Sequence, residues 1–247
     1  MTPELTIEDH VATITLRRAK QANRLDPDDL AVLAEHVATV NARDEVLVLR
    51  LQSHGKYFCS GYDIGQIGGP RELTFEQMVD AFEEARPVTL AVLQGGVYGG
   101  ATDLALACDF RIGSRAVDMF LPAARLGLHF YQRGLERYVS RLGVNTSKKL
   151  FLTAEKIGAD EMLACGFLTH LVPADDLSAS ADQLTQTLAS MAPLALLGMK
   201  KHLTRIARGV LDSADLQRDI ARAAQSADLK EGAAAWAAKR PARFTGR

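Results

Sequence analysis

Two stretches decide the fold of this chain, and they read FCSGYDI at residues 58–64 and GGVYGGATD at residues 95–103. Each follows a short apolar run, at residues 46–49 and 88–92, that predicts a strand. Each leads into a segment that can begin a helix. Glycine allows backbone conformations that a side chain forbids, so a ligand can approach the main chain closely. Two backbone N–H groups on neighbouring turns, one of them at a helix N-terminus, could form a hole for developing negative charge on an oxygen.

The composition is that of one compact unit with a sizeable core. The chain has 247 residues, of which 47% are hydrophobic and 24% charged, and its formal net charge of −1 provides no global field that favours nucleic acid. Cys59, Cys108 and Cys165 lack disulfide or zinc spacing, which indicates buried thiols in a reducing compartment. We see neither a signal peptide nor an apolar run of about 18 residues, and therefore expect a soluble cytoplasmic protein that does not enter a membrane.

The first third of the chain predicts a hairpin followed by a helix. Residues 5–7 and 11–16 alternate apolar and polar positions, as the strands of a hairpin do. Asp26 and Pro27 then provide an acceptor cap and a proline at the first helical position. The apolar stripe of this helix comprises Leu30, Leu33, Val37 and Val40.

Further elements follow in strand and helix alternation. Thr74 opens a capping box for a second helix, and the glycine-rich residues 65–70 before it predict a mobile loop. Strands are expected at residues 110–112 and 168–172, and helix ends at Gly143 and Gly166. From about Leu177 onward the pattern is helical only, with a last helix over residues 232–238. The whole predicts an α/β core with a C-terminal helical segment.

The two glycine turns resemble those of the enoyl-CoA hydratase/isomerase, or crotonase, superfamily. Residues 58–64 keep the Phe, Gly and Asp of the family's first segment, Phe-Ser-Ala-Gly-Ala-Asp-Leu. The second segment, Asn-Gly-x-x-x-Gly-Gly-Gly-x-Glu-Leu-Ala-x-x-Cys-Asp, matches at residues 94–95, 99–100, 103–105 and 108–109. The resemblance extends from residues 17–23 to the tail at 239–244. It implies the crotonase (ClpP/crotonase-like) α/β fold of repeated ββα units.

The same resemblance implies a domain organisation and an assembly. Residues 1–190 would form the core with the CoA site, and residues 191–247 a C-terminal helical segment that lies over this core or on a neighbouring subunit. A homotrimer, or a hexamer built as a dimer of trimers, is expected. The expected small-molecule partner is an acyl-CoA thioester, in which coenzyme A is part of the substrate.

Family members stabilise a thioester enolate, and the resemblance implies which residues would do so here. The backbone N–H groups of Tyr62 and Gly100 would bind the thioester oxygen. The ring of Tyr62 could contact the acyl group, cover the mouth of the site, or be a packed aromatic with a solvated hydroxyl. Coenzyme A would be held by residues at two places along the chain, namely Lys20, Gln21, Tyr62, Asp63 and Ile64, although Lys20 fits a surface lysine equally well.

Two departures from the family pattern bear on the reaction. Hydratases of the family use two glutamates to activate a water, and Asp103 stands where the first is found. Ala123 stands where the second is found, and an alanine can neither accept nor donate a proton. Hydration in the standard manner is therefore not expected. Asp103 itself could be a general base, or an acid placed near a helix N-terminus because the helix dipole favours it there.

The loop after Gly127 carries further candidate groups. His129 and Tyr131 are candidate proton donors, and Arg133 could pair with a substrate carboxylate, although these side chains could also merely pack against a neighbour. Residues 97–101 and 61–64 are similar to those of methylmalonyl-CoA decarboxylase-like members. Loss of CO2 requires an enolate hole and a proton donor, but no pair of carboxylates that activates water.

We therefore expect enolate chemistry, either decarboxylation or double-bond isomerisation, by a lyase or isomerase of acyl-CoA and fatty acid metabolism. One alternative is a non-catalytic acyl-CoA-binding or scaffold homologue. Another is RNA binding through the basic run at residues 200–208, which is more typical of a solvated helix face. No pattern in the sequence requires a metal or a redox cofactor.

Overall fold

The structure is a computed structural model that describes residues 1–66 and 73–247. The strands are β1 (Glu4–Glu8), β2 (Val11–Leu16), β3 (Val48–Ser53), β4 (Val88–Leu93), β5 (Val97–Tyr98), β6 (Phe110–Ser114), β7 (Asp118–Phe120), β8 (Ile157–Gly158) and β9 (His170–Val172). The helices are α1 (Pro27–Asn41), α2 (Phe75–Glu83), α3 (Gly100–Ala107), α4 (Gln132–Thr153), α5 (Ala159–Ala164), α6 (Leu177–Ala189), α7 (Pro193–Ala207), α8 (Ser213–Ala224) and α9 (Ala227–Ala237). Short 3-10 turns include Ala19–Gln21, Ile64–Gln66 and Ala123–Leu126.

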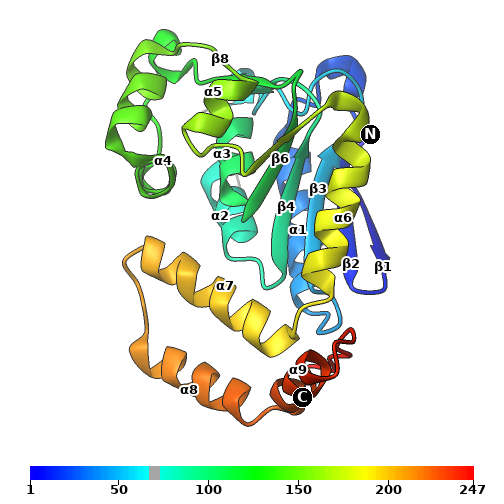
Figure 1. Cartoon of the computed structure of the whole chain (residues 1–247). Coiled ribbons are helices and arrows are strands. Elements are labelled where there is room, and N and C mark those ends of the chain that lie inside the picture. The colour runs from blue at the N-terminus through cyan, green and yellow to red at the C-terminus, as the bar shows by residue number, and fades with distance from the viewer. Residues whose placement is uncertain (67–72) are drawn as a thin grey trace.

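The described strands form one large sheet and one small sheet. The large sheet has the order β1-β2-β3-β4-β6-β9, and its pairs are parallel except for the predicted β1–β2 hairpin. The small sheet has the order β5-β7-β8. Parallel strands need crossover connections, and helices between the strands provide them here. The predicted α/β fold with a helical C-terminal region is confirmed (Figure 1).

The large sheet is covered on both faces. Helices α1, α2 and α3 lie on one face, and α6 lies on the other (Figure 1). All six residues of β4 are buried for this reason, which explains why its sequence is apolar on both faces except at Thr89, whose N–H and hydroxyl donate to Asp109.

The predicted helix starts of α1 and α2 are confirmed. Asp26 accepts from the N–H of Asp29, and the Asp29 side chain accepts in return from the N–H of Asp26. Thr74 and Gln77 form the same reciprocal capping box. The four apolar stripe positions of α1 are buried, as expected. The loop predicted just before α2 falls largely on residues 67–72, which lie outside the described residues.

Two glycines lie at helix ends where the sequence predicts them. Gly143 has φ +77° and breaks α4 into two helical segments, and Gly166 has φ +81° just after α5. The last helix begins earlier than predicted, at Ala227, because the side chain of Ser226 accepts from the N–H of Leu229. The predicted strand at 168–172 is shorter at its start, since β9 begins at His170.

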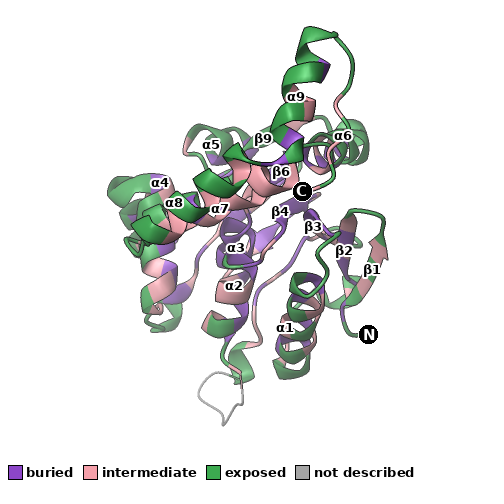
Figure 2. Ribbon diagram, turned by 90° about the horizontal axis from the view of Figure 1, so that it is seen from below, coloured by how far each residue is buried: buried purple, intermediate pink, exposed green. Residues whose placement is uncertain are grey.

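The C-terminal helices α7, α8 and α9 lie beyond one end of the large sheet (Figure 1). The basic run on α7 is not the solvated face that its sequence suggests, since Lys200 and His202 are buried. Most of α7 is intermediate in exposure (Figure 2). The Nζ of Lys200 donates to the carbonyls of Ala85 and Pro87, so it ties α7 to the core.

Cys59 and Cys108 are buried free thiols, as expected, whereas Cys165 is only partly buried. Burial raises the pKa of Cys59 and of Cys108 to about 12, so both are inert thiols near neutral pH. Within residues 1–66 and 73–247, no helix is long and apolar enough to span a membrane.

Candidate active site

The two glycine turns are in direct contact, as the sequence leads one to expect. Cys59 pairs with Val97 in an isolated parallel bridge, and the N–H of Tyr98 donates to the carbonyl of Cys59 across 3.0 Å. A Cβ atom placed on Gly61 would lie 2.7 Å from the carbonyl oxygen of Tyr98 and 3.1 Å from the nitrogen of Gly100. Gly61 also has φ +94°, so glycine is required here both by conformation and by the close approach of the second turn.

The backbone around Tyr62 orients its N–H group. Leu25 lies beside Tyr62 in a parallel bridge, in which its N–H donates to the carbonyl of Gly61 and its carbonyl accepts from the N–H of Asp63. Backbone groups alternate in direction along an extended segment, so the N–H of Tyr62 points away from Leu25.

Gly100 provides the second candidate donor. It is the first residue of α3, and the N–H at this position has no acceptor inside its own helix. The positive end of the α3 dipole lies at the same place. The ring of Phe75 packs against Gly100, since a Cβ on Gly100 would lie 2.7 Å from Cζ of Phe75.

Asp103 and Tyr131, two candidates from different parts of the sequence, are joined by a hydrogen bond. Asp103 lies one helical turn after Gly100 on α3, and its side chain is fully buried. The hydroxyl of Tyr131 donates to Oδ2 of Asp103 across 2.5 Å. The ring centroid of Tyr131 lies 6.3 Å from that of Phe75. The ring centroid of Phe75 lies 5.7 Å from that of Tyr62. Phe75 therefore links Tyr131 with both glycine turns.

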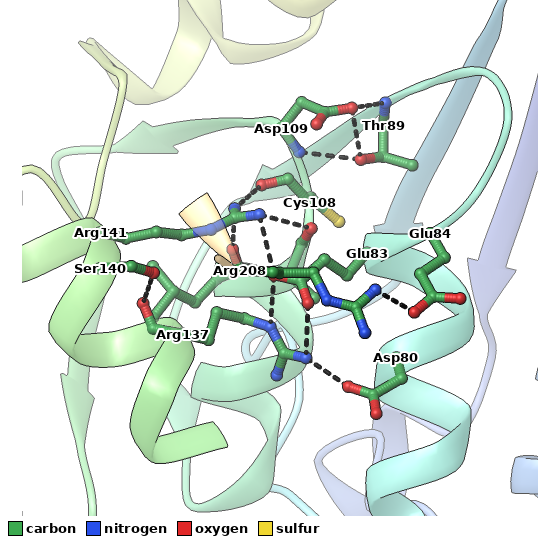
Figure 3. A network of polar contacts seen from close by, with 12 residues as sticks. Asp80, Glu83, Glu84, Thr89, Cys108, Asp109, Arg137, Ser140, Arg141 and Arg208 are labelled. Carbon is green, nitrogen blue, oxygen red and sulfur yellow. Dashed lines mark hydrogen bonds and ion pairs between the residues drawn. The ribbon is translucent and has the colours of Figure 1, made fainter. Parts of the chain in front are cut away.

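A buried arginine, Arg137 on α4, holds the same carboxyl. Its Nη1 donates to Oδ2 of Asp103 across 2.6 Å, its Nη2 to Asp80 across 2.6 Å, and its Nε to Glu83 across 3.0 Å. Its side chain has no exposed surface. Figure 3 shows this guanidinium beside the acids of α2, with Arg141 on the same helix face. Three helices, α2, α3 and α4, thus meet at one ion network.

The environment shifts the pKa values of this network in directions that follow from burial and charge. Burial raises the pKa of Asp103, against the opposing effects of the Arg137 charge and the Tyr131 hydrogen bond. Burial and the neighbouring Asp103 charge raise the pKa of Tyr131 well above its usual value. Burial alone would raise the pKa of Glu83, but the guanidinium groups of Arg137 and its neighbours bring that pKa below the ordinary value.

Arg137 is not among the residues that the sequence patterns single out. A signal was present, because Arg133, Arg137 and Arg141 recur every four residues and so share one face of α4. On α2, Asp80 and Glu83 are three residues apart and provide the matching negative face. Such charge runs usually lie on solvated surfaces, so only the packing of α2 on α4 distinguishes this one.

The other two loop candidates, His129 and Arg133, differ in their surroundings. His129 is exposed, and its Nδ1 lies 2.7 Å from the carbonyl oxygen of Phe130. Arg133 is part of the ion network, with Glu83 at 2.9 Å and Glu136 at 2.5 Å. Ala123 is buried at the start of a 3-10 turn.

The residues expected to bind coenzyme A lie on the surface around the first glycine turn. Lys20 and Gln21 are exposed on the 3-10 turn after β2. Asp63 is half-buried, accepts from the N–H of Gly65, and lies 3.4 Å from Arg24, while Ile64 is exposed.

One group of side chains in the described part of the chain has the spacing of a metal site. The ligand atoms of His202, Asp215 and Asp219 lie within 4.8 Å of one another. The Nζ of Lys201 contacts both aspartates, at 2.7 and 2.6 Å, and Arg205 contacts Asp215 at 2.6 Å. The acids are therefore already neutralised by fixed cations, which makes the group a poor cation site.

Comparisons with known proteins agree with this architecture. The family model for enoyl-CoA hydratase/isomerase matches residues 6–247. An (E)-benzylidenesuccinyl-CoA hydratase of Thauera aromatica is 29% identical and covers 80% of each chain. The methylmalonyl-CoA decarboxylase of Escherichia coli is 26% identical and covers 96% of this chain and 95% of its own.

A solved structure has the same fold. An enoyl-CoA hydratase/carnithine racemase from Magnetospirillum magneticum superposes with a TM-score of 0.92 at 24% identity, covering 100% of this chain and 96% of that chain. The chain belongs to the enoyl-CoA hydratase/isomerase family. It has the crotonase fold, and the members of the family are acyl-CoA-processing enzymes. Since relatives of similar identity include a hydratase and a decarboxylase, the residues of the site must decide between reactions.

Proposed function

We propose that this protein decarboxylates a malonyl-type CoA thioester through a thioester enolate. The observation that carries the proposal is the hydrogen bond between Tyr131 and Asp103, made on the oxygen that Arg137 also holds. The reaction breaks the bond between C2 and the carboxylate, releases CO2, and leaves the electron pair on C2 and the thioester oxygen. A proton added to C2 completes it.

The two glycine turns support the first half of this reaction. The N–H groups of Tyr62 and Gly100 would donate to the thioester oxygen as its negative charge develops. Removing one such donor from an oxyanion hole typically costs about 3 kcal/mol of transition-state stabilisation. The coenzyme A portion would extend over Asp63 and Ile64 toward Lys20 and Gln21.

The Asp103–Tyr131 pair supports the second half. The two groups hold a proton between Oδ2 of Asp103 and Oη of Tyr131, one helical turn from Gly100. Decarboxylation needs no base to remove a C–H proton and no water, so Ala123 is compatible with it. Hydration by two carboxylates is not compatible with the site, because Ala123 stands where the second glutamate of the family's hydratases is found.

Double-bond isomerisation is the second candidate, and a separate observation favours it. Among the described residues, Oδ1 of Asp103 is buried and has no hydrogen-bond partner. Because no hydrogen-bond donor occupies this oxygen, it could remove a proton from one carbon of a 3-enoyl thioester and return it to another carbon. If the protein shows neither activity, the remaining alternative is a non-catalytic acyl-CoA-binding homologue.

The proposal is tested by incubating the purified protein separately with methylmalonyl-CoA, a 3-enoyl-CoA and crotonyl-CoA, and resolving the products by mass. Loss of CO2 from the first is expected. If the 3-enoyl-CoA is isomerised and methylmalonyl-CoA loses no CO2, isomerisation takes the place of decarboxylation as the proposed reaction. Addition of water to crotonyl-CoA at an enzymatic rate would overturn both.

We also infer that α7 contributes to self-association, in a trimer or a dimer of trimers. Met199, Leu203 and Ile206 recur on one face of α7, and each is more than half exposed. Sedimentation equilibrium would test this, with a monomer at micromolar concentration as the contradicting result.

A further inference from the structure

The guanidinium of Arg137 is the centre of the buried ion network, and it uses all of its nitrogens. Nη1 binds Asp103, Nε binds Glu83, and Nη2 binds both Asp80 and Glu83, at 2.6 and 3.2 Å. The planar fork of arginine matches this arrangement in a way that the point charge of a lysine does not. A fully buried ion pair is usually no more stabilising than a well-packed apolar substitute. Stability alone therefore does not account for an arginine at this position.

We propose that Arg137 is a positioning residue, which fixes the carboxyl group of Asp103 through Oδ2 and sets its proton affinity, with Glu83 as the counter-ion that tunes this effect. The inference rests on the proposed function, in which Asp103 and Tyr131 carry the proton. It goes further because it assigns control of that proton to a residue that does not touch substrate.

The geometry at the carboxyl group carries the inference. Both strong donors, Nη1 of Arg137 and the hydroxyl of Tyr131, converge on Oδ2 of Asp103. Among the described residues none binds Oδ1. Two donors from different directions on one oxygen fix the plane and rotation of the carboxyl group. The proton held between Oδ2 and the hydroxyl of Tyr131 is therefore fixed in its position as well.

The charges around Asp103 determine in which direction each substitution should shift its titration. From α4 and the loop before it, Arg137, Tyr131 and Tyr138 face Asp103, and Glu83 acts from α2. The positive charge of Arg137 favours the ionised form of Asp103, while the negative charge of Glu83 opposes it.

The remaining charges of the network act on Glu83 rather than on Asp103. Arg133 and Arg141 lie 2.9 and 3.3 Å from the Glu83 carboxylate. Asp80 lies on the far side of the Arg137 guanidinium, 2.6 Å from Nη2, and is only partly buried. Neutralising Glu83 and neutralising the Arg137–Glu83 pair should therefore shift the titration of Asp103 in opposite directions.

Two variants separate this role from a purely structural one. Glu83→Gln keeps the shape of Glu83 and the charge of Arg137. The double variant Arg137→Met with Glu83→Gln removes one positive and one negative charge together, so the net charge of the network stays the same. Glu136→Gln is the matched control, because Glu136 pairs with Arg133 at the exposed edge of the network without contacting Arg137.

The experiment follows the Asp103 carboxyl directly by 13C NMR, in full-length protein labelled at aspartate Cγ, with Asp103→Asn to assign the signal. The titration midpoint should fall in Glu83→Gln and rise by about one pH unit in the double variant, because the direct contact with Arg137 outweighs the more distant Glu83. It should not change in Glu136→Gln. The pH dependence of kcat should shift in the same directions, and kcat of the double variant should fall at least about tenfold.

The outcomes separate the two proposals. An unchanged midpoint in both folded test variants would overturn the role of Arg137, whether or not the enzyme is active. Shifted midpoints in a protein that turns over none of the three thioesters would confirm the coupling of Arg137 to Asp103 and overturn the proposed function instead. A fall in both variants would show that Glu83 outweighs Arg137 and would contradict the proposal for Arg137.

Discussion

The hydroxyl of Tyr131 lies 2.5 Å from Oδ2 of Asp103, although 28 residues separate them in the sequence. Asp103 is placed by the first turn of α3, and Tyr131 by the loop that ends at the start of α4. Their contact puts a phenol and a carboxyl group within one helical turn of the Gly100 N–H. It is the point at which the proton in the proposed reaction is held.

Tyr131→Phe should lower kcat at least about tenfold with little change in KM, because it removes the hydroxyl but keeps the ring against Phe75. Tyr138→Phe is the matched control. Tyr138 belongs to the same aromatic cluster, but its hydroxyl donates to Oγ1 of Thr102 and not to Asp103, so kcat should be retained. Steady-state kinetics on the thioester that the wild type accepts measures both. Equal losses in the two variants would exclude a special role for Tyr131.

Asp103→Asn should lower kcat at least about tenfold if Asp103 handles the proton, and little if it is only a helix-end acid. The variant also makes a prediction for stability. Burial raises the pKa of Asp103, so the folded state binds a proton more tightly than the unfolded state. This contribution to stability is complete at low pH and is lost as the pH rises through the raised pKa. Urea unfolding should therefore show the stability advantage of the wild type over Asp103→Asn shrinking with increasing pH.

Gly61→Ala should abolish turnover, because its Cβ would lie 2.7 Å from the carbonyl oxygen of Tyr98 and would push the two glycine turns apart. The positive φ of Gly61 adds strain of about 1 kcal/mol or more. Gly158→Ala is the control, since no heavy atom lies within 4 Å of its added Cβ and its φ is negative. Wild-type rates in a folded Gly61→Ala protein would be incompatible with an oxyanion hole between these turns.

Lys200→Met should destabilise the protein by about 2–4 kcal/mol, because it leaves the buried carbonyls of Ala85 and Pro87 without their donor. Lys201→Met should cost about 1 kcal/mol or less, since the ion pairs of Lys201 are partly exposed. Denaturant unfolding of both variants measures the difference. If the two cost the same, Lys200 does not anchor α7 to the core.

The sequence predicts the fold well, and it identifies two side chains that the structure brings together. Caps such as Asp26 and Thr74, and the helix ends at Gly143 and Gly166, follow from local chemistry that sequence patterns record. The contact between the two glycine turns follows from the parallel order of β3 and β4. Asp103 and Tyr131 are also found, each as a separate candidate.

The contacts between helices are not predictable in this way. Arg137 looks like any other residue of a basic helix face until α2 packs against it and buries it. Lys200 is misjudged for the same reason, because a run of basic residues usually marks a solvated surface. Nothing in a single sequence states which charged face meets another, since that depends on the crossing of helices far apart in the chain.

The measurement that tests the account most directly is the decarboxylation of methylmalonyl-CoA in deuterated water. The enolate is planar at C2, so a proton delivered by the fixed Asp103–Tyr131 pair arrives on one face only. The account predicts a thioester with one deuterium at C2 and a single configuration, and a mixture of configurations from Tyr131→Phe. A racemic product from the wild type, or no loss of CO2 at all, would contradict it.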